Sequence, residues 1–156
     1  MELSKIQPCL WFNDQAREAM EYYTAIFPNS RIRSIETYPD EGLDEHFEGM
    51  RDKVINGEFT LDGVDFVCLD GGPAFQLSEA VSFVVTCTDQ DEIDYYWHAL
   101  SHTPESEQCG WCKDRFGVSW QIIPATLPQL MTTPKQIQTF MAMKKIVIAE
   151  LEDAGL

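Results

Sequence analysis

Hydrophobic and polar positions follow the same order in both halves of the chain. Each copy is an apolar run, then an Asp-Gln pair, then an acid-rich stretch that contains a Tyr-Tyr pair. The two copies occupy residues 10–27 and 83–100, and the Asp of the pair recurs after 75 positions, as Asp14 and Asp89. Self-similarity at a spacing of half the chain indicates an internal duplication. Two small halves that pack together are expected to form a site between them.

The first half predicts a strand, a helix and three further strands. The apolar run at 6–12 is typical of a strand, and Asn13 or Asp14 can cap the helix that follows. Residues 32–38 alternate as a strand does, and Asp62-Gly63 predicts a hairpin between strands at 54–61 and 64–69. The polar segment 39–53 is expected to be an exposed loop. The helix has its apolar residues at helical spacing: Ala16, Ala19, Met20, Tyr23, Ile26 and Phe27.

The second half repeats this order and adds a tail. A strand is expected at 80–87, a helix after Asp89, an extended segment at 109–113 and a strand at 118–123. The helix has an apolar stripe of Ile93, Tyr96, Trp97 and Leu100. Beyond Pro124, the spacing of apolar residues predicts one further amphipathic helix, which contains Ile137, Phe140, Met141, Val147, Ile148 and Leu151.

Composition limits the partners and the compartment. The 156 residues include 26 acidic and 11 basic side chains, a formal charge of −15, which repels nucleic acid and anionic membranes. No apolar run reaches the roughly 18–20 residues of a membrane span, and the first seven residues do not resemble a signal peptide. Five cysteines without a leader fit a reducing cytoplasm better than a disulfide framework. We therefore expect a cytoplasmic protein with no nucleic-acid or membrane partner.

Four stretches of the chain, in this order, resemble the PhnB-like family of the glyoxalase, or vicinal-oxygen-chelate, superfamily. They are PCLWFNDQAREAMEYYTAIFPNSRI (8–32), FTLDGVDFVCLDGGPAF (59–75), EAVSFVVTCTDQDEIDYYWHAL (79–100) and QCGWCKDRFGVSWQIIP (108–124). The resemblance implies an α+β fold in which two βαβββ modules form a half-barrel around a cavity. The modules would span about 5–75 and 78–124, followed by a C-terminal helical tail at 125–156, within a single domain 1–156. It also implies a homodimer, often with modules paired across subunits.

Members of this family often carry the description demethylubiquinone methyltransferase. Binding of S-adenosylmethionine in the common methyltransferase fold uses a glycine-rich turn after the first parallel strand, and no such turn occurs here. The expected antiparallel hairpins also argue against a doubly wound sheet. The sequence therefore disfavours methyl transfer.

The resemblance also implies where the superfamily's divalent metal would be held. The ligand positions fall at Gln7, Ser82 and Gln121, with the fourth at Cys68 or Asp70. Gln7, Ser82 and Gln121 are neutral oxygen donors, and this set lacks the imidazoles and carboxylates that bind transition metals tightly. We therefore expect no metal or other cofactor at this position, and a divalent metal is the alternative.

A second metal site is a weaker alternative. Two imidazoles four residues apart on a predicted helix, together with a CxxC pair, have the composition of a Cys2His2 zinc site. Thioredoxin-like chemistry is disfavoured, because that pair opens a helix and this one leads into a turn and a strand. The four residues concerned are His98, His102, Cys109 and Cys112.

Alternation along the strands separates two kinds of face. The faces with Leu10 and Phe12, Phe83 and Val85, and Trp120 and Ile122 are apolar, as expected where a helix packs. The other faces carry amides, hydroxyls, thiols and one aromatic ring, which suits a small organic ligand with a few polar groups. The candidate ligand-binding residues are Gln7, Trp11, Cys68, Asp70, Ser82, Ser119 and Gln121.

These observations predict a PhnB-like protein that binds a small, unidentified metabolite. One alternative is a metal-dependent lyase, isomerase or dioxygenase of the same fold, in which Asp70 is the candidate catalytic base. Another is a structural dimer whose cavity is filled by its own side chains. The sequence does not decide whether the protein is an enzyme.

Overall fold

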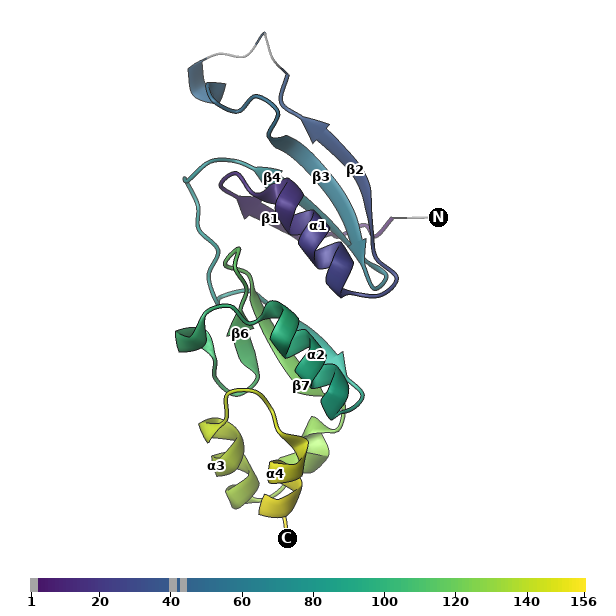
Figure 1. Ribbon diagram of the computed structural model, residues 1–156, viewed down its shortest axis with the longest axis vertical. Helices are drawn as coiled ribbons and strands as arrows, with labels where there is room; N and C mark the ends of the chain where they lie inside the picture. Colours follow the sequence, from purple (N-terminus) through teal and green to yellow (C-terminus); the bar gives the residue numbers. More distant parts are fainter. Residues whose placement is uncertain (1–2, 40–41, 43–44) are drawn as a thin grey trace. The chain divides into compact units, whose positions relative to one another are not determined.

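The computed structural model describes residues 3–39, 42 and 45–156, and the chain divides into two compact units, Met1–Leu77 and Ser78–Leu156 (Figure 1). Each unit contains one copy of the repeated pattern. Both have the α+β composition expected from the sequence, with one small sheet and one covering helix in each. That the two form a single domain stays a prediction.

Unit 1 contains the βαβββ order that the sequence predicts. Its helix and strands are β1 (Cys9–Phe12), α1 (Ala16–Ile26), β2 (Arg31–Thr37), β3 (Val54–Leu61) and β4 (Val64–Asp70). Its sheet has the order β1-β4-β3-β2, in which β1 pairs with β4 in parallel and the other pairs are antiparallel. Between β2 and β3 lies a short 3₁₀ turn, η1 (Glu45–Phe47), while residues 40–41 and 43–44 of the expected loop lie outside the described residues.

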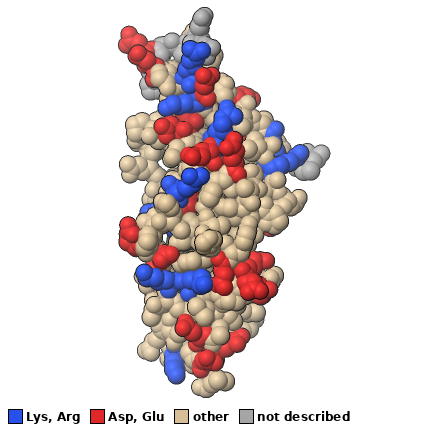
Figure 2. Space-filling model, in the orientation of Figure 1, with Lys and Arg blue, Asp and Glu red and all other residues tan. Residues whose placement is uncertain are grey.

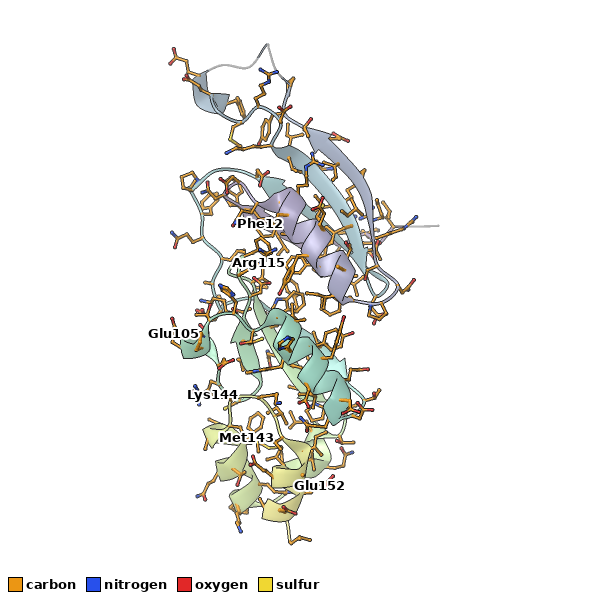
Figure 3. The ribbon with its side chains drawn as sticks, viewed as in Figure 1. Phe12, Glu105, Arg115, Met143, Lys144 and Glu152 are labelled. Carbon is orange, nitrogen blue, oxygen red and sulfur yellow. The ribbon has the colours of Figure 1, made fainter. Side chains whose placement is uncertain are left out.

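Helix α1 packs on one face of this sheet through the apolar stripe read from the sequence. Tyr23 is fully buried and its ring stacks on Phe59, which in turn stacks on Phe66 with 5.2 Å between ring centroids. Met20 reaches the sheet at Gly57, where an added Cβ atom would lie 2.7 Å from the Met20 Cε atom. The close approach therefore needs glycine. Figure 3 shows Phe12 beside α1, on the face of the sheet that the helix covers.

Unit 2 contains β5 (Ser82–Cys87), α2 (Gln90–Leu100), η2 (Pro104–Ser106), β6 (Trp111–Lys113) and β7 (Ser119–Pro124). Its sheet has the order β5-β7-β6, with β5 and β7 parallel and β6 and β7 antiparallel. Within residues 78–156, all of which the structure describes, this sheet has three strands, one fewer than the predicted second βαβββ module. Only residues 101–110 connect α2 to β6, whereas residues 27–53 connect α1 to β3. The shorter connection forms η2 where unit 1 has β2.

A buried carboxylate shapes the turn before β7. Asp114 is 2% exposed, and its Oδ1 atom accepts hydrogen bonds from the backbone amides of Phe116 (2.8 Å) and Val118 (3.0 Å). Its Oδ2 atom accepts a hydrogen bond from the Trp120 indole at 2.9 Å. Asp114 therefore fixes both the turn and the Trp120 side chain, which lies among the buried residues of the unit.

The tail forms two helices, α3 (Pro134–Ala142) and α4 (Ile148–Ala154), after a 3₁₀ turn η3 (Leu127–Leu130). The prediction of one helix is wrong at the segment between them, where Figure 3 shows Met143 and Lys144. The carbonyl groups of Met143 and Lys144 accept hydrogen bonds from the backbone amides of Cys109 and Gly110, both at 2.8 Å. These long-range hydrogen bonds hold the segment against the turn before β6 and interrupt the helix.

Gln90 joins the tail to α2. Its Nε2 atom donates to the Ile146 carbonyl at 2.9 Å, and its Oε1 atom accepts from the Ile148 amide at 2.8 Å. Gln15 holds the same position in the first copy of the repeat, but its side chain is exposed and donates only a long hydrogen bond, 3.4 Å, to Glu18. The duplicated Asp-Gln pair therefore has different roles in the two units.

No helix among the described residues is long and apolar enough to cross a membrane. On the face drawn in Figure 2, acidic and basic side chains are interspersed. The formal charge of −15 is the sum over all 156 residues and does not describe this face alone.

The different roles of the two glutamines predict different effects on stability. Gln90→Ala should lower the free energy of unfolding by about 1–3 kcal/mol, because it leaves a backbone carbonyl and a backbone amide without their partner. Gln15→Ala is the matched control and should change it by less than about 0.5 kcal/mol. Urea denaturation followed by circular dichroism measures both. Equal effects of the two substitutions would contradict the attachment of the tail through Gln90.

Candidate ligand-binding site

Strand register decides which candidate residues share a face. Residues directly opposite each other in a parallel pair point to the same side of the sheet. In unit 1, Trp11 pairs with Leu69 on the side away from α1, which we call the helix-free face of the unit. Leu10 pairs with Cys68, and Phe12 pairs with Asp70, on the side that α1 covers. Cys68 and Asp70 therefore lie on the helix-covered face, and their expected place beside the cavity is wrong.

Asp70 serves the fold at this position. It is 2% exposed, its Oδ1 atom accepts a hydrogen bond from the Ala16 amide (2.8 Å), and its Oδ2 atom accepts one from the Val54 amide (2.9 Å). Ala16 is the first residue of α1, where a negative charge is favourable to the helix dipole. Because each carboxylate oxygen is bound to the backbone, Asp70 is poorly placed to act as a catalytic base.

Cys68 is fully buried under α1. Burial raises the pKa of its thiol to about 12, with smaller contributions from the charges of Asp70 and Cys9. A thiol that holds its proton this firmly is a poor nucleophile and a poor metal ligand. Cys68 therefore belongs to the core of unit 1.

Gln7 takes part in a charge network on the helix-free face of unit 1. It precedes β1, and its Oε1 atom accepts a hydrogen bond from the Arg33 guanidinium at 3.2 Å. Arg33 also donates to the Thr60 hydroxyl at 3.1 Å and lies 3.8 Å from the carboxylates of Glu58 and Asp65. A hydrogen bond from the Ser4 amide, followed by one from Thr60, lowers the pKa of Asp65. Sequence reasoning missed Arg33, which lies at a break in the register between β2 and β3.

Trp11 lies on the same face and is held by the chain that follows β4. Its indole Nε1 atom donates to the Gly72 carbonyl at 2.9 Å, and its ring meets Phe75 edge-on with 4.8 Å between centroids. An added Cβ atom at Gly71 would lie 2.2 Å from the indole ring, so glycine is needed there. Trp11 is half-buried and has a fixed orientation.

The helix-free face of unit 2 brings the other candidates together. Register places Ser82, Ser119 and Lys113 in one row across β5, β7 and β6. The next row contains Val84, Gln121 and Trp111. Phe83, Trp120 and Cys112 alternate with these rows and lie on the other face, toward α2, as the apolar pattern of β5 and β7 predicts.

Polar groups on this face are incompletely paired. Gln121 donates from Nε2 to the Ser82 hydroxyl at 3.0 Å. Ser119 is 2% exposed, and its Oγ atom has no hydrogen-bond partner within the part of the chain that the structure describes. Lys113 forms an ion pair with Glu79. Lys113 and Glu79 were missed from the sequence, although counting back across the turn at 114–117 places Lys113 opposite Ser119.

The expected metal positions do not fit a tightly bound transition metal. Gln7, Ser82 and Gln121 offer neutral oxygen atoms, and the Gln7 oxygen already accepts from a guanidinium, whose positive charge disfavours a cation nearby. Among the described residues, no three or more His, Cys, Asp or Glu side chains are grouped so that they could hold a metal ion. The donor set of this chain therefore differs from that of the metal centres of the superfamily it resembles.

The alternative zinc ligands are also not brought together. His98 and His102 are exposed, whereas Cys109 and Cys112 are buried. The Cys109 thiol lies 3.5 Å from the Met141 carbonyl in the tail, and burial raises the pKa of Cys112 to about 12. The structure therefore gives no support to a Cys2His2 site.

Two surface hollows contain none of the candidate ligand-binding residues, although the second borders the network of Gln7 and Arg33. One, of about 830 Å³, is shallow and lies between α3 and α4, where its walls include Lys135, Lys144, Lys145, Glu150 and Asp153. The other, of about 300 Å³, lies beside the turn of the first hairpin, at Ser4, Asn29, Ser30, Arg31, Thr60, Gly63 and Asp65. Neither contains a residue of the helix-free face of unit 2.

Comparisons with known proteins agree with the fold. A family model described as 3-demethylubiquinone-9 3-methyltransferase matches residues 4–123. The PhnB protein from Bacillus cereus is 36% identical over 78% of this chain and 100% of its own, with a TM-score of 0.66. The Pseudomonas aeruginosa protein PA1353 is 18% identical over 78% of this chain and 97% of its own, with a TM-score of 0.59, and shows likeness of fold alone. No curated protein matches the chain. The family match ends before α3 and α4.

The position of Asp70 predicts a loss of stability when its charge is removed. Asp70→Asn turns one acceptor oxygen into a donor that faces a backbone amide, so the free energy of unfolding should fall by about 1–3 kcal/mol. Asp153→Asn, at an exposed position in α4, should change it by less than about 0.5 kcal/mol. Urea denaturation checks both values. An Asp70→Asn protein as stable as the wild type would show that the two backbone hydrogen bonds do not support the fold.

Proposed function

This chain belongs to the PhnB-like family described as 3-demethylubiquinone-9 3-methyltransferase, within the glyoxalase superfamily, and we propose that it binds a small metabolite on the helix-free faces of its sheets. The observation that supports the proposal most strongly is the Ser119 hydroxyl, which is buried without a partner among the described residues. A buried hydroxyl without a hydrogen bond is costly, and a ligand that bonds to it would remove that cost.

The composition of the face in unit 2 supports the same proposal. Hydroxyl, amide and ammonium groups lie beside an aromatic ring and an aliphatic side chain, whereas the α2 side is almost wholly apolar. A small number of polar groups within an apolar surface is typical of sites for small organic molecules. A structural role without a ligand would leave Ser119 unexplained.

Methyl transfer has no counterpart in the residues of this chain. β1 is followed by Asn13 and Asp14, where the common methyltransferase fold has its glycine-rich turn. Both sheets mix parallel and antiparallel pairs, and neither is doubly wound. The chain therefore lacks the elements with which the common methyltransferase fold binds S-adenosylmethionine.

A metal-dependent lyase, isomerase or dioxygenase is less well supported than binding. The carboxylate expected to act as a base, Asp70, accepts hydrogen bonds from backbone amides of α1 and β3, and the metal positions hold neutral donors.

We also propose that the protein is a homodimer in the cytoplasm. The five cysteines, all free, support a reducing compartment, and the family resemblance supports the dimer.

Ligand binding should raise the melting temperature in a way that depends on Gln121. At a hundredfold excess over its Kd, a ligand that binds only the folded protein adds about 2.7 kcal/mol of stability, or several degrees in Tm. We expect a panel of metabolites to contain at least one that gives this shift. Gln121→Leu should lose most of the shift, because it removes the amide that orients Ser82, and Gln138→Leu, at an exposed position on α3, should keep it.

Differential scanning fluorimetry measures these shifts. Equal shifts in the Gln121→Leu and Gln138→Leu proteins would contradict the proposed place of binding. Metal analysis of protein purified without chelator distinguishes a metal-dependent enzyme from a metal-free binding protein. A stoichiometric bound transition metal would favour the enzyme.

A further inference from the structure

Resting on the proposed binding function, we propose that the ligand group recognised by unit 2 is a carboxylate, bound by Lys113 after it displaces the Glu79 side chain. Lys113 ends the short strand β6 and lies in the same row as Ser119 and Ser82 on the helix-free face. This row contains one cation and two hydroxyl groups. Nothing in the sequence resemblance assigns a role to Lys113 or Glu79.

The two hydroxyl groups of this row can each donate a hydrogen bond to a ligand. The Ser119 hydroxyl has no partner among the described residues. The Ser82 hydroxyl accepts from Gln121, which leaves its own proton for a further acceptor. A carboxylate has only acceptor sites, so it matches a row in which an ammonium group lies next to one hydroxyl donor, Ser119, with a second, Ser82, beyond it.

Glu79 shows that Lys113 already binds a carboxylate. The Glu79 side chain is 58% exposed and that of Lys113 is 26% exposed, so the acid reaches the lysine from the solvent side. The hydrogen bond from Lys113 lowers the pKa of Glu79, so Lys113 favours the ionised form of this acid. An ion pair this exposed adds little stability and exchanges readily with another anion.

The side chains of the neighbouring row indicate the chemistry of the rest of the ligand. Trp111 and Val84 lie on either side of Gln121, and Val84 is 54% exposed although it is aliphatic. An indole ring beside an exposed aliphatic side chain suits a flat, unsaturated body. The chain's charge of −15 disfavours ligands with more than one negative charge, so a monoanionic carboxylate fits better than a phosphoryl dianion.

A purely structural ion pair is the competing explanation. In that case Lys113 and Glu79 only hold the segment before β5 against β6. Removing either charge would then lower stability by a similar small amount, and neither substitution would alter ligand binding. Competition for Lys113 instead requires opposite effects of the two substitutions.

The test uses NMR titration of the full-length ¹⁵N-labelled protein with three probes. Benzoate carries the carboxylate on a flat ring, benzamide is its neutral counterpart, and phenylphosphonate is an anion that can carry two negative charges. The variants are Lys113→Gln, Glu79→Gln and, as a matched control at an exposed lysine, Lys135→Gln. Circular dichroism shows whether each variant is folded.

We expect benzoate to bind more tightly than benzamide and to shift the amide signals of Ser82, Lys113 and Ser119. Lys113→Gln should weaken benzoate about tenfold or more, because it removes a charge-assisted hydrogen bond. Glu79→Gln should strengthen it several-fold, because the competing carboxylate is gone. Lys135→Gln should leave it unchanged.

Four results would overturn the inference. They are absence of benzoate binding, benzamide binding as tightly as benzoate, Glu79→Gln failing to strengthen benzoate binding, and phenylphosphonate binding more tightly than benzoate. The proposed function is judged separately by the metabolite panel, so a panel member that stabilises the wild type through Gln121 would keep that function while the carboxylate assignment fails.

Discussion

Within each unit, as far as the structure describes it, one helix packs against one face of the sheet, α1 in unit 1 and α2 in unit 2. The alternation of side chains along each strand decides which residues face that helix. Side chains that point toward α1 or α2 must form a core, and those between them point to the other side. In unit 1 the buried side chains on the helix-covered face include Phe59, Phe66 and Cys68. In unit 2 the buried side chains on the face toward α2 include Trp120 and Ile122. The polar groups that the core excludes gather on the helix-free faces, and this is the reason for placing a ligand there.

The buried acids show how the same constraint treats polar residues. Asp70 and Asp114 are both 2% exposed, and each accepts two hydrogen bonds from backbone amides. A buried carboxylate is tolerated when its oxygens are satisfied in this way. Ser119 is as deeply buried as these acids and has no such bond among the described residues. Asp70 and Asp114 therefore stabilise the fold through hydrogen bonds to the backbone. The Ser119 hydroxyl makes no such bond among the described residues, and we propose that it binds the ligand.

The duplicated pattern predicted the elements of both units well, because apolar spacing within a strand or helix is a local property. The face of Cys68 and Asp70 was predicted wrongly, because it depends on the register between β1 and β4, which pairs residues far apart in the chain. The break between α3 and α4 depends on hydrogen bonds to Cys109 and Gly110, and no local pattern contains them. Arg33 was missed for a similar reason, since its partners lie on β3 and β4.

The most direct measurement is a crystal structure of the protein purified without chelator and without added ligand. The account predicts density for a small molecule on the helix-free face of unit 2, in contact with the Ser119 hydroxyl and within reach of Lys113. A structure in which a protein group hydrogen-bonds to Ser119 and no small molecule lies on that face would contradict it, as would a small molecule bound only between α3 and α4.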